Sequence, residues 1–582
     1  MKELLQLNKY FWKYKKLLLA GAFFILLSKL FAVFQAPLVR KSLNLIIEKV
    51  NDKDADVDLL SWELAEYALY MVGAAIVSGL FLYLTRQTII VMSRLMEFDI
   101  KNEIFEHYQT LPLSFYRKNS TGDLMSRISE DVGKVRMYLG PGVMYGISLV
   151  VICVTVISAM LSVNVQLTLI VLTPLPLLSV TIYIVSNKLN KRSEEIQQQM
   201  AGLSTFTQEA FSGMRVLKAF VREEYFIGKM EKRSESYKTH ALKLAMLQST
   251  FFPTIILLIG LSTLLTVYFG GVLSINNSDF TAGNIAEFML YLGMLTWPVT
   301  SIGWVTSIIQ SAAASQKRIN EFLNTKTDIT FDENNKVEIK GNIEFKNVSL
   351  VYPESGIKAL DNVSFTICAG ETVAVVGDTG AGKSSLAALL CRNYDPTSGE
   401  IFIEGEKLNM INLHYFREQL GYVPQDAFLF SNTIRQNLLF GKEDATEDEI
   451  IAATKHAAVY DNIKDFKEGF DTVLGERGIT ISGGQKQRLT IARALIKNPK
   501  LLILDDSLSA VDTDTENIIL NSLKKLMIDR TSVIISHRIS SVKLASKILV
   551  LHEGKLVEQG SHKELVALKG YYFAIYEKQH KE

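Results

Sequence analysis

Residues 377–384 read Gly377-Asp-Thr-Gly-Ala-Gly-Lys383-Ser384, and this stretch decides the fold of the second half of the chain. It follows the apolar strand pattern Thr372–Val376 and opens the helical pattern Ser384–Cys391. Glycines let backbone N–H groups close around phosphates at the positive end of a helix. The lysine reaches the β- and γ-phosphates, and the serine hydroxyl ligates Mg²⁺. We therefore predict an ATP site built from Gly377, Asp378, Thr379, Gly380, Ala381, Gly382, Lys383, Ser384 and Ser385.

A second apolar strand is predicted at Leu501–Leu504 and runs into Asp505. Taken alone, such an aspartate more often occupies a turn. Downstream of a phosphate loop, a carboxylate at the end of a buried strand suits a Mg²⁺ site. We expect Asp505 and Ser384 to hold the metal that accompanies ATP.

The 582-residue chain is nearly neutral, with 62 Lys and Arg against 61 Asp and Glu, so nothing indicates a nucleic acid partner. Its mean hydropathy is positive although 21% of the residues are charged, which indicates a hydrophobic part and a soluble part. The three cysteines, Cys153, Cys368 and Cys391, match no metal or disulfide spacing and are predicted to be small buried apolar residues.

Six apolar stretches in the first half are long enough to cross a bilayer as helices, which takes about 20 residues. Buried helices of a soluble protein are the alternative, but six such runs argue against it. A tight turn around Asn164 separates the third from the fourth, and Pro174 is expected to bend the fourth. The stretches are Leu17–Val39, Tyr67–Ile90, Pro141–Val163, Gln166–Ser186, Met246–Leu273 and Ile285–Gln310.

Lys and Arg gather on one side of these spans, in residues 1–16, 94–136 and 188–243, whereas residues 274–284 contain none and residues 52–58 lean acidic. Because Lys and Arg favour the cytoplasmic side, we predict a multi-pass protein of the cytoplasmic membrane with its N-terminus and nucleotide domain in the cytoplasm. Polar helical patterns run through both long inner segments, which are therefore predicted to be helical extensions.

A polar stretch without apolar periodicity marks a domain boundary near residues 325–340. After it, strands are predicted at Asn342–Tyr352, Val363–Cys368, Thr372–Val376 and Ile401–Glu404, alternating later with helices. The predicted fold is multi-domain. An all-α transmembrane domain of six helices (1–324) and a linker (325–340) precede an α/β P-loop nucleotide-binding domain (341–582).

Ile481-Ser-Gly-Gly-Gln485 resembles the signature of the ATP-binding cassette (ABC) family. Further motifs match this family: an aromatic residue before the phosphate loop, the Q-loop, the D-loop, the switch histidine and the segment Gly475–Gly478. The resemblance implies that Tyr352 stacks on adenine, that Gln425 reaches Mg²⁺, and that His537 contacts the γ-phosphate. It also implies that Ser482, Gly483, Gly484 and Gln485 face the ATP of another subunit, with Ser509–Asp512 as the D-loop.

The first half is similar to ABC exporters at Leu113–Arg127 and Gly213–Phe220, their two intracellular coupling regions. The resemblance implies a half-transporter that pairs with a second one and holds two ATP molecules between two cassettes. Its membrane helices alternate their opening. The implied function is ATP-driven export of hydrophobic or amphipathic drugs or lipids, in contact with membrane lipid.

Asp506 departs from the family pattern, which has a catalytic glutamate after the metal-binding aspartate. The aspartate carboxylate falls about an ångström short, and a misplacement of that size costs on the order of 100-fold in rate. The chain therefore resembles the subunit with the weakened site in bacterial heterodimeric multidrug exporters, whose partner carries the glutamate. The resemblance implies that Asp506, His537 and Gln425 are the catalytic residues of this slow site. The alternative is tolerated variation with a slow but working site, and a homodimer is also open.

Two features of the membrane half bear on the cargo. Lys29 lies inside the first span, where it marks either a cavity or a side chain that snorkels to the interface. The sixth span carries large flexible and aromatic residues that suit either a greasy cavity or ordinary packing: Phe288, Met289, Tyr291, Met294, Trp297 and Trp304. An importer with the exporter fold, an ATP-gated channel or channel regulator, and a soluble ABC protein remain alternatives.

Overall fold

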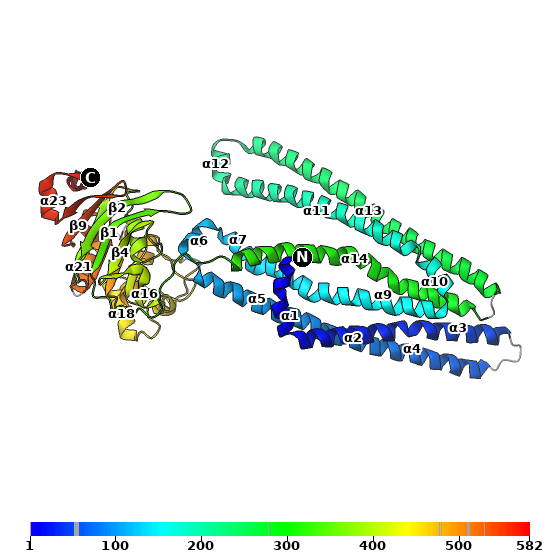
Figure 1. Ribbon diagram of the computed structural model, residues 1–582. Coiled ribbons are helices and arrows are strands. Elements are labelled where there is room, and N and C mark those ends of the chain that lie inside the picture. The colour runs from blue at the N-terminus through cyan, green and yellow to red at the C-terminus, as the bar shows by residue number, and fades with distance from the viewer. Residues whose placement is uncertain are drawn as a thin grey trace. The chain divides into compact units, whose positions relative to one another are not determined.

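The computed structural model describes residues 2–51, 57–276, 279–475, 478, 480–508, 513–528 and 530–581. The chain forms two compact units, Met1–Gln109 with Gly122–Thr325 and Thr110–Thr121 with Lys326–Glu582. The first is helical and the second is α/β, as the sequence predicts (Figure 1). The short segment Thr110–Thr121 belongs by its contacts to the nucleotide unit although it lies within the helical half of the sequence.

Long helices make up the first unit. Among the described residues, five are long and apolar enough to cross a membrane, namely Lys15–Lys49, Leu60–Thr110, Thr121–Val163, Glu223–Asn276 and Ala282–Leu323. They cover five of the six predicted spans. The remaining predicted span, 166–186, is helical as well, and its membrane crossing stays a prediction. The helices are α1 Asn8–Lys13, α2 Lys15–Val33, α3 Gln35–Asn51, α4 Val57–Thr85, α5 Val91–Thr110, α7 Thr121–Ser126, α8 Val132–Met137, α9 Val143–Val163, α10 Val165–Leu172, α11 Pro174–Ser212, α12 Met214–Ala219, α13 Glu223–Asn276 and α14 Ala282–Leu323.

Local sequence explains the breaks between these helices. Asn164 adopts an extended backbone and its side chain accepts from the Leu167 N–H, which caps α10 and makes the predicted tight turn. The next helix, α11, begins at Pro174, because proline suits the first turn of a helix and not its interior. The two inner segments are helical, as predicted, since α5, α11 and α13 run through them.

The antiparallel pair α2 and α4 is held in register by small and polar residues. Ser28 and Ser78 exchange hydrogen bonds, each hydroxyl donating to the other's carbonyl at 3.0 Å. Further along, a Cβ on Gly21 would lie 2.4 Å from the Ile89 side chain, so only glycine permits this approach. A π-helical turn, Arg86–Ile90, follows α4 at that level.

The second unit contains two sheets. A four-stranded antiparallel sheet has the order β2-β1-β4-β5, and a six-stranded, mostly parallel sheet has the order β10-β9-β3-β8-β7-β6. The predicted strands are all present. The strands are β1 Ile343–Val351, β2 Lys358–Ile367, β3 Thr372–Gly377, β4 Ser398–Ile403, β5 Glu406–Lys407, β6 Leu420–Val423, β7 Leu501–Asp505, β8 Thr531–Ile535, β9 Lys547–His552 and β10 Lys555–Gly560.

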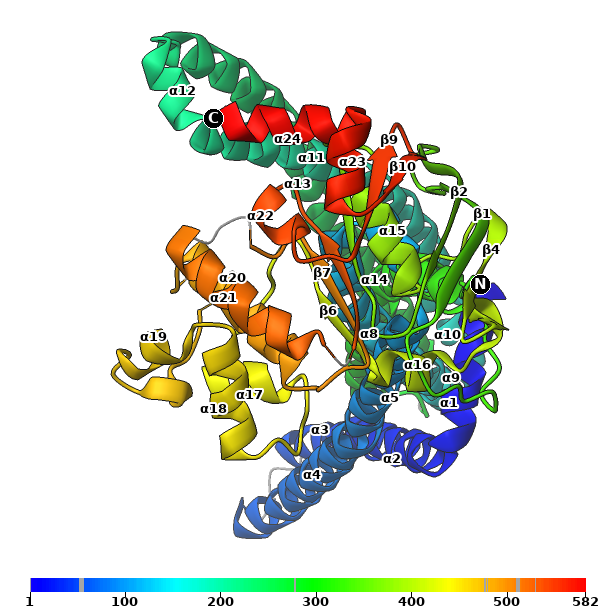
Figure 2. The same ribbon diagram turned by 90° about the vertical axis from the view of Figure 1, so that its left-hand side faces the viewer.

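Helix α15 packs between the two sheets (Figure 2). Its Leu386, Leu389 and Leu390 share one core with β1 to β4 and with β7. A second core unites helices α17, α18, α20 and α21 beside the large sheet. The helices are α6 Leu113–Lys118, α15 Lys383–Leu390, α16 Leu413–Glu418, α17 Ile434–Leu439, α18 Glu447–His456, α19 Tyr460–Lys464, α20 Gly483–Leu495, α21 Thr513–Leu526, α22 Ile539–Val542, α23 His562–Leu568 and α24 Tyr571–Lys581.

The central strands β3, β7 and β8 are buried almost throughout, which explains their continuous apolar sequences. Because parallel strands end at the same edge, the segments that follow β3, β6, β7 and β8 meet there. The cysteine prediction was partly wrong: Cys391 is buried and Cys153 half-buried, but Cys368 is exposed.

Candidate functional site

The phosphate loop lies between β3 and α15, as the sequence predicts. Gly382 has φ of +95° and a Cβ there would meet the Ala359 carbonyl oxygen at 2.3 Å, so this position requires glycine. The Lys383 ammonium donates to the carbonyl oxygens of Gly377 and Asp378, at 2.9 and 2.8 Å. Its side chain is thereby held across the loop, where its charge would face the phosphates of a bound nucleotide.

The two predicted metal ligands are in contact. The Ser384 hydroxyl donates to Asp505 Oδ1 at 3.1 Å. Burial, together with the neighbouring Asp506, raises the pKa of the Asp505 carboxyl to about 6. A buried carboxylate beside a hydroxyl, open to substrate phosphates, fits Mg²⁺, which is bound by one or two carboxylates plus phosphate oxygens. The third predicted ligand, Gln425, lies in an exposed loop after β6, which pairs with β7.

Asp506 adopts a left-handed backbone conformation directly after β7, with φ of +44°. Its N–H donates to the Ile535 carbonyl of β8 at 2.8 Å. Aspartate tolerates this conformation better than most residues because its short polar side chain hydrogen-bonds locally. The carboxylate is thus fixed at the edge of the sheet, and its negative charge acts on Lys383 and His537.

His537 follows β8 at the same edge. Burial and the nearby Lys383 charge hold the pKa of its imidazole below the ordinary value, so the ring is neutral at physiological pH. Gln579, which lies in no sequence motif, supports the segment 537–539. The Gln579 amide of α24 donates to the His537 carbonyl and accepts from the Ile539 N–H, at 3.0 Å for the latter contact.

A buried carboxylate, Glu516 of α21, ties the same segment to the helix that follows the D-loop. Glu516 is paired with Arg538 and accepts from the Ser540 hydroxyl at 2.6 Å. The predicted D-loop, Ser509–Asp512, lies outside the described residues. So do Glu476 and Arg477 of the predicted segment Gly475–Gly478.

Tyr352, the predicted adenine-stacking residue, lies at the end of β1. Its hydroxyl donates to the Ser385 hydroxyl oxygen at 2.9 Å, which joins the aromatic ring to the phosphate loop. Tyr394 contacts it edge-on at 5.0 Å between ring centroids. Arg117 of α6, within the same unit, lies over both rings at 5.4 and 5.6 Å. Arg117 lies within the predicted coupling region Leu113–Arg127, but no motif indicates this contact, and Tyr394 lies in no motif.

The signature residues begin α20. The Ser482 hydroxyl accepts from the Gln485 N–H at 3.2 Å, and the Gln485 side chain accepts from the Ser482 N–H at 3.0 Å. This reciprocal cap leaves the glycine N–H groups at the positive end of a 13-residue helix. Helix α20 packs in the core formed with α17, α18 and α21, whereas α15 packs in the core between the two sheets. Ser482 and Gly483 are exposed, which suits an anion brought by another molecule.

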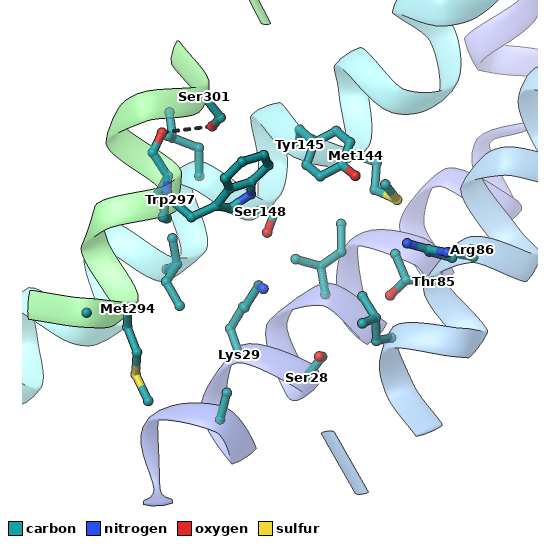
Figure 3. A pocket seen from close by; sticks show the side chains of 17 residues that line it. Ser28, Lys29, Thr85, Arg86, Met144, Tyr145, Ser148, Met294, Trp297 and Ser301 are labelled. Carbon is teal, nitrogen blue, oxygen red and sulfur yellow. Dashed lines mark hydrogen bonds between the residues drawn. The ribbon is translucent and has the colours of Figure 1, made fainter. Parts of the chain in front are cut away.

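A second candidate site is a cavity of about 400 Å³ within the helical unit, lined by residues of α2, α4, the π-helical turn, α9 and α14 (Figure 3). Lys29 lines it, which favours the cavity interpretation over snorkelling. Of the residues considered in the sixth span, Met294 and Trp297 line it. Phe288 and Tyr291 are instead buried in the helical core.

Two family models match the chain: the ABC transporter transmembrane region over residues 18–299 and ABC transporter over residues 360–509. YheI of Bacillus subtilis, a probable multidrug resistance ABC transporter, is 37% identical and covers 84% of this chain and 83% of its own length. YknU of the same organism, an uncharacterized ABC transporter ATP-binding protein, is 33% identical over 100% of this chain and 98% of its own. An ATP-dependent lipid A-core flippase of Syntrophus aciditrophicus is 34% identical, over 91% and 87%.

A solved structure of a bacterial Atm1-family ABC exporter with ATP bound superposes with a TM-score of 0.82 at 26% identity. It covers 97% of this chain, and 99% of that chain is matched. The likeness therefore extends over both the helical and the nucleotide unit.

Proposed function

Because the chain belongs to the ABC transporter family, we propose that it couples ATP hydrolysis to the export of hydrophobic or amphipathic molecules, drugs or lipids, across the cytoplasmic membrane. The observation that carries this is the contact of Ser384 with Asp505 beside a phosphate loop crossed by Lys383, in a chain that also carries apolar helices of membrane-spanning length. The printed names of the relatives, multidrug transporters and a lipid A-core flippase, support the substrate class.

The chain's own residues divide the work on ATP. Tyr352 stacks on the adenine ring, and the loop N–H groups with Lys383 neutralise the β- and γ-phosphates. Ser384 and Asp505 would hold Mg²⁺, with Gln425 as a third protein ligand, and the bound metal would supply positive charge for the phosphates. His537, whose ring is neutral, donates to the γ-phosphate, while Asp506 orients the attacking water.

We further infer that the chain works with a second half-transporter. The exposed, capped signature at Ser482–Gln485 suits ATP held by another subunit, and ABC exporters work as dimers. Asp506 supports a heterodimer in which the partner supplies a catalytic glutamate and this chain supplies the signature facing it. The basic inner segments support the proposal that the N-terminus and the nucleotide unit lie on the cytoplasmic side.

Transport in inside-out vesicles that contain the chain and its partner tests the export proposal. A fluorescent amphiphilic dye should accumulate with ATP and Mg²⁺ and should fail to accumulate with Lys383→Ala. The matched control is Lys407→Ala, since Lys407 lies on the surface strand β5 and is paired with Glu400. ATP-dependent dye release instead of uptake would favour the importer alternative. No ATP-dependent movement of any amphiphile would contradict a transporter.

A further inference from the structure

The cavity of the helical unit carries two cations that lack counter-charges. Lys29 of α2 and Arg86 of the π-helical turn both line it, and the lining contains no Asp or Glu. Among the described residues, no carboxylate is paired with either side chain. Arg40, by contrast, has a partner: it lies 3.0 Å from the buried Glu287, to which Tyr291 also donates.

Lys29 lies well inside the span, whereas Arg86 lies nearer to its predicted cytoplasmic end. At 1.5 Å per residue, Lys29 is about 21 Å along α2 from its start at Lys15, in a hydrocarbon core of about 30 Å. Ser28 lies level with Ser78 of α4. Arg86 is therefore about 12 Å from that level, towards the predicted cytoplasmic end. The cavity thus presents positive charge at two depths.

Three of the neutral hydroxyls that line the cavity have their protons engaged by the backbone and provide little for an anion. The hydroxyls of Ser28, Thr85 and Ser301 donate to the backbone carbonyls of Ser78, Phe81 and Pro298, at 3.0, 2.9 and 2.8 Å. Backbone carbonyls take up these three protons, and the remaining neutral hydroxyls of the lining, those of Tyr145 and Ser148, carry no net charge. Charge preference therefore rests on Lys29 and Arg86, whose side chains reach into the cavity in Figure 3.

The rest of the lining is apolar and adaptable. Met144, Met294 and Trp297 face the space, together with aliphatic side chains of α2, α4 and α9. A volume of about 400 Å³ suits a drug-sized molecule and not an entire two-chain lipid. An uncompensated cation at this depth is unfavourable by several kcal/mol, which a bound anion offsets.

We propose that this cavity binds amphiphiles with an anionic head group, phosphate, sulfate or carboxylate, held by Arg86 and Lys29 with the apolar part against Met294 and Trp297. The inference rests on the proposed export function and names its substrate class. The head group enters at Arg86 and moves deeper to Lys29. Cationic amphiphiles are disfavoured, because the lining offers them hydroxyl acceptors but no carboxylate.

The proposal is tested by measuring equilibrium binding of two probes to the full chain in nanodiscs of zwitterionic lipid. The partner is included where the pair is required for isolation. The probes are two fluorescent single-chain amphiphiles of equal length, one with a phosphate and one with a trimethylammonium head group. The phosphate probe should bind about 100-fold tighter, the effect of two charge-assisted contacts of about tenfold each. Lys29→Gln and Arg86→Gln should each weaken it about tenfold, and the double variant should abolish the preference.

Three controls make the result decisive. Lys41→Gln removes an exposed lysine of α3 outside the cavity and should leave binding unchanged. Lys29→Arg with Arg86→Lys keeps both charges and should retain the preference. Lys29→Glu with Arg86→Glu should reverse it in favour of the trimethylammonium probe. Binding of a fluorescent ATP analogue to each variant shows that the chain is folded.

The source of the head group is decided by competition. Displacement of the phosphate probe by acidic phospholipid in the nanodisc assigns the site to lipid head groups, and displacement only by soluble anionic amphiphiles assigns it to drug-sized solutes. Equal binding of both probes by the unaltered chain, or unchanged binding in the double variant, would overturn the proposal. Failure of the export function is distinguishable, because it abolishes ATP-dependent transport of every amphiphile whatever its charge.

Discussion

Replacing Asp506 by glutamate tests whether carboxylate length limits hydrolysis in this chain's own ATP site. The backbone at Asp506 has no freedom to compensate for a short side chain. Its N–H is bonded to Ile535 of β8 at 2.8 Å, so a shift of an ångström would break a ladder contact between buried strands. The carboxylate therefore moves towards the γ-phosphate only if the side chain is lengthened.

The size of the effect follows from geometry. One added carbon–carbon bond of about 1.5 Å extends the carboxylate by about an ångström. A correction of that size is worth up to about 100-fold in rate, or about 2.7 kcal/mol of barrier. Asp506→Glu should therefore raise turnover about 10- to 100-fold. The left-handed φ of +44° suits glutamate less well, so the variant should lose up to about 1 kcal/mol of stability.

The assay measures single-turnover hydrolysis of labelled ATP by the full chain together with a partner. The partner's own catalytic carboxylate is neutralised, so the measured rate comes from this chain's ATP site. Asp506→Asn keeps the length and removes the charge, and should abolish the residual rate. Asp444→Glu adds the same methylene in an exposed loop and should change nothing. If Asp506→Glu leaves the rate within twofold and Asp506→Asn retains it, carboxylate length is not the limit and the heterodimer inference loses its main support.

Three further perturbations follow from the nucleotide unit. Tyr352→Ala should weaken binding of a fluorescent ATP analogue about tenfold, because base stacking contributes roughly 1–3 kcal/mol, whereas Tyr352→Phe loses only the hydrogen bond to Ser385 and should weaken it under threefold. The folded chain takes up an extra proton at Asp505 between the ordinary pKa of 3.8 and about 6, so stability without nucleotide falls as pH rises through that window. Asp505→Asn should remove that dependence, stabilise the chain at pH 7 by up to about 3 kcal/mol in denaturant titrations, and abolish Mg²⁺-dependent ATP binding. Glu516→Ala should destabilise the nucleotide unit by about 2 kcal/mol in the same titration, because Arg538 loses a buried carboxylate, and Glu516→Gln should be milder since it keeps the contact with Ser540; equal losses would contradict the ion-pair reasoning.

The phosphate site could be predicted from sequence because its geometry is local. A buried strand, a glycine loop and a helix place Gly382 and Lys383 by themselves. The contact between Ser384 and Asp505 needs only that β3 and β7 lie in one parallel sheet, which their uniformly apolar sequences indicate. Such features follow from short-range backbone preferences and burial.

Other residues could not be found in this way because their roles depend on long-range side-chain contacts. Gln579 supports His537 from a helix near the end of the chain, and Arg117 reaches Tyr352 from a segment more than 200 positions earlier in the sequence. Arg86 lies within a predicted span, but only the register of α2 against α4 places it on the same cavity as Lys29.

In both units, the charged groups whose ionised form is least favourable in the protein are those with a proposed ligand of opposite charge. Asp505 is buried with its pKa raised, and Mg²⁺ would satisfy the ionised form. Lys29 faces a cavity without a carboxylate, and an anionic head group would satisfy it. Each ligand should stabilise its own unit by mass action. If either charge served only folding, its replacement would destabilise its unit, and no ligand binding would be lost. A replacement that stabilises the fold and abolishes ligand binding identifies a binding site. We expect this result both for Asp505 with Mg²⁺ and for Lys29 with an anionic amphiphile.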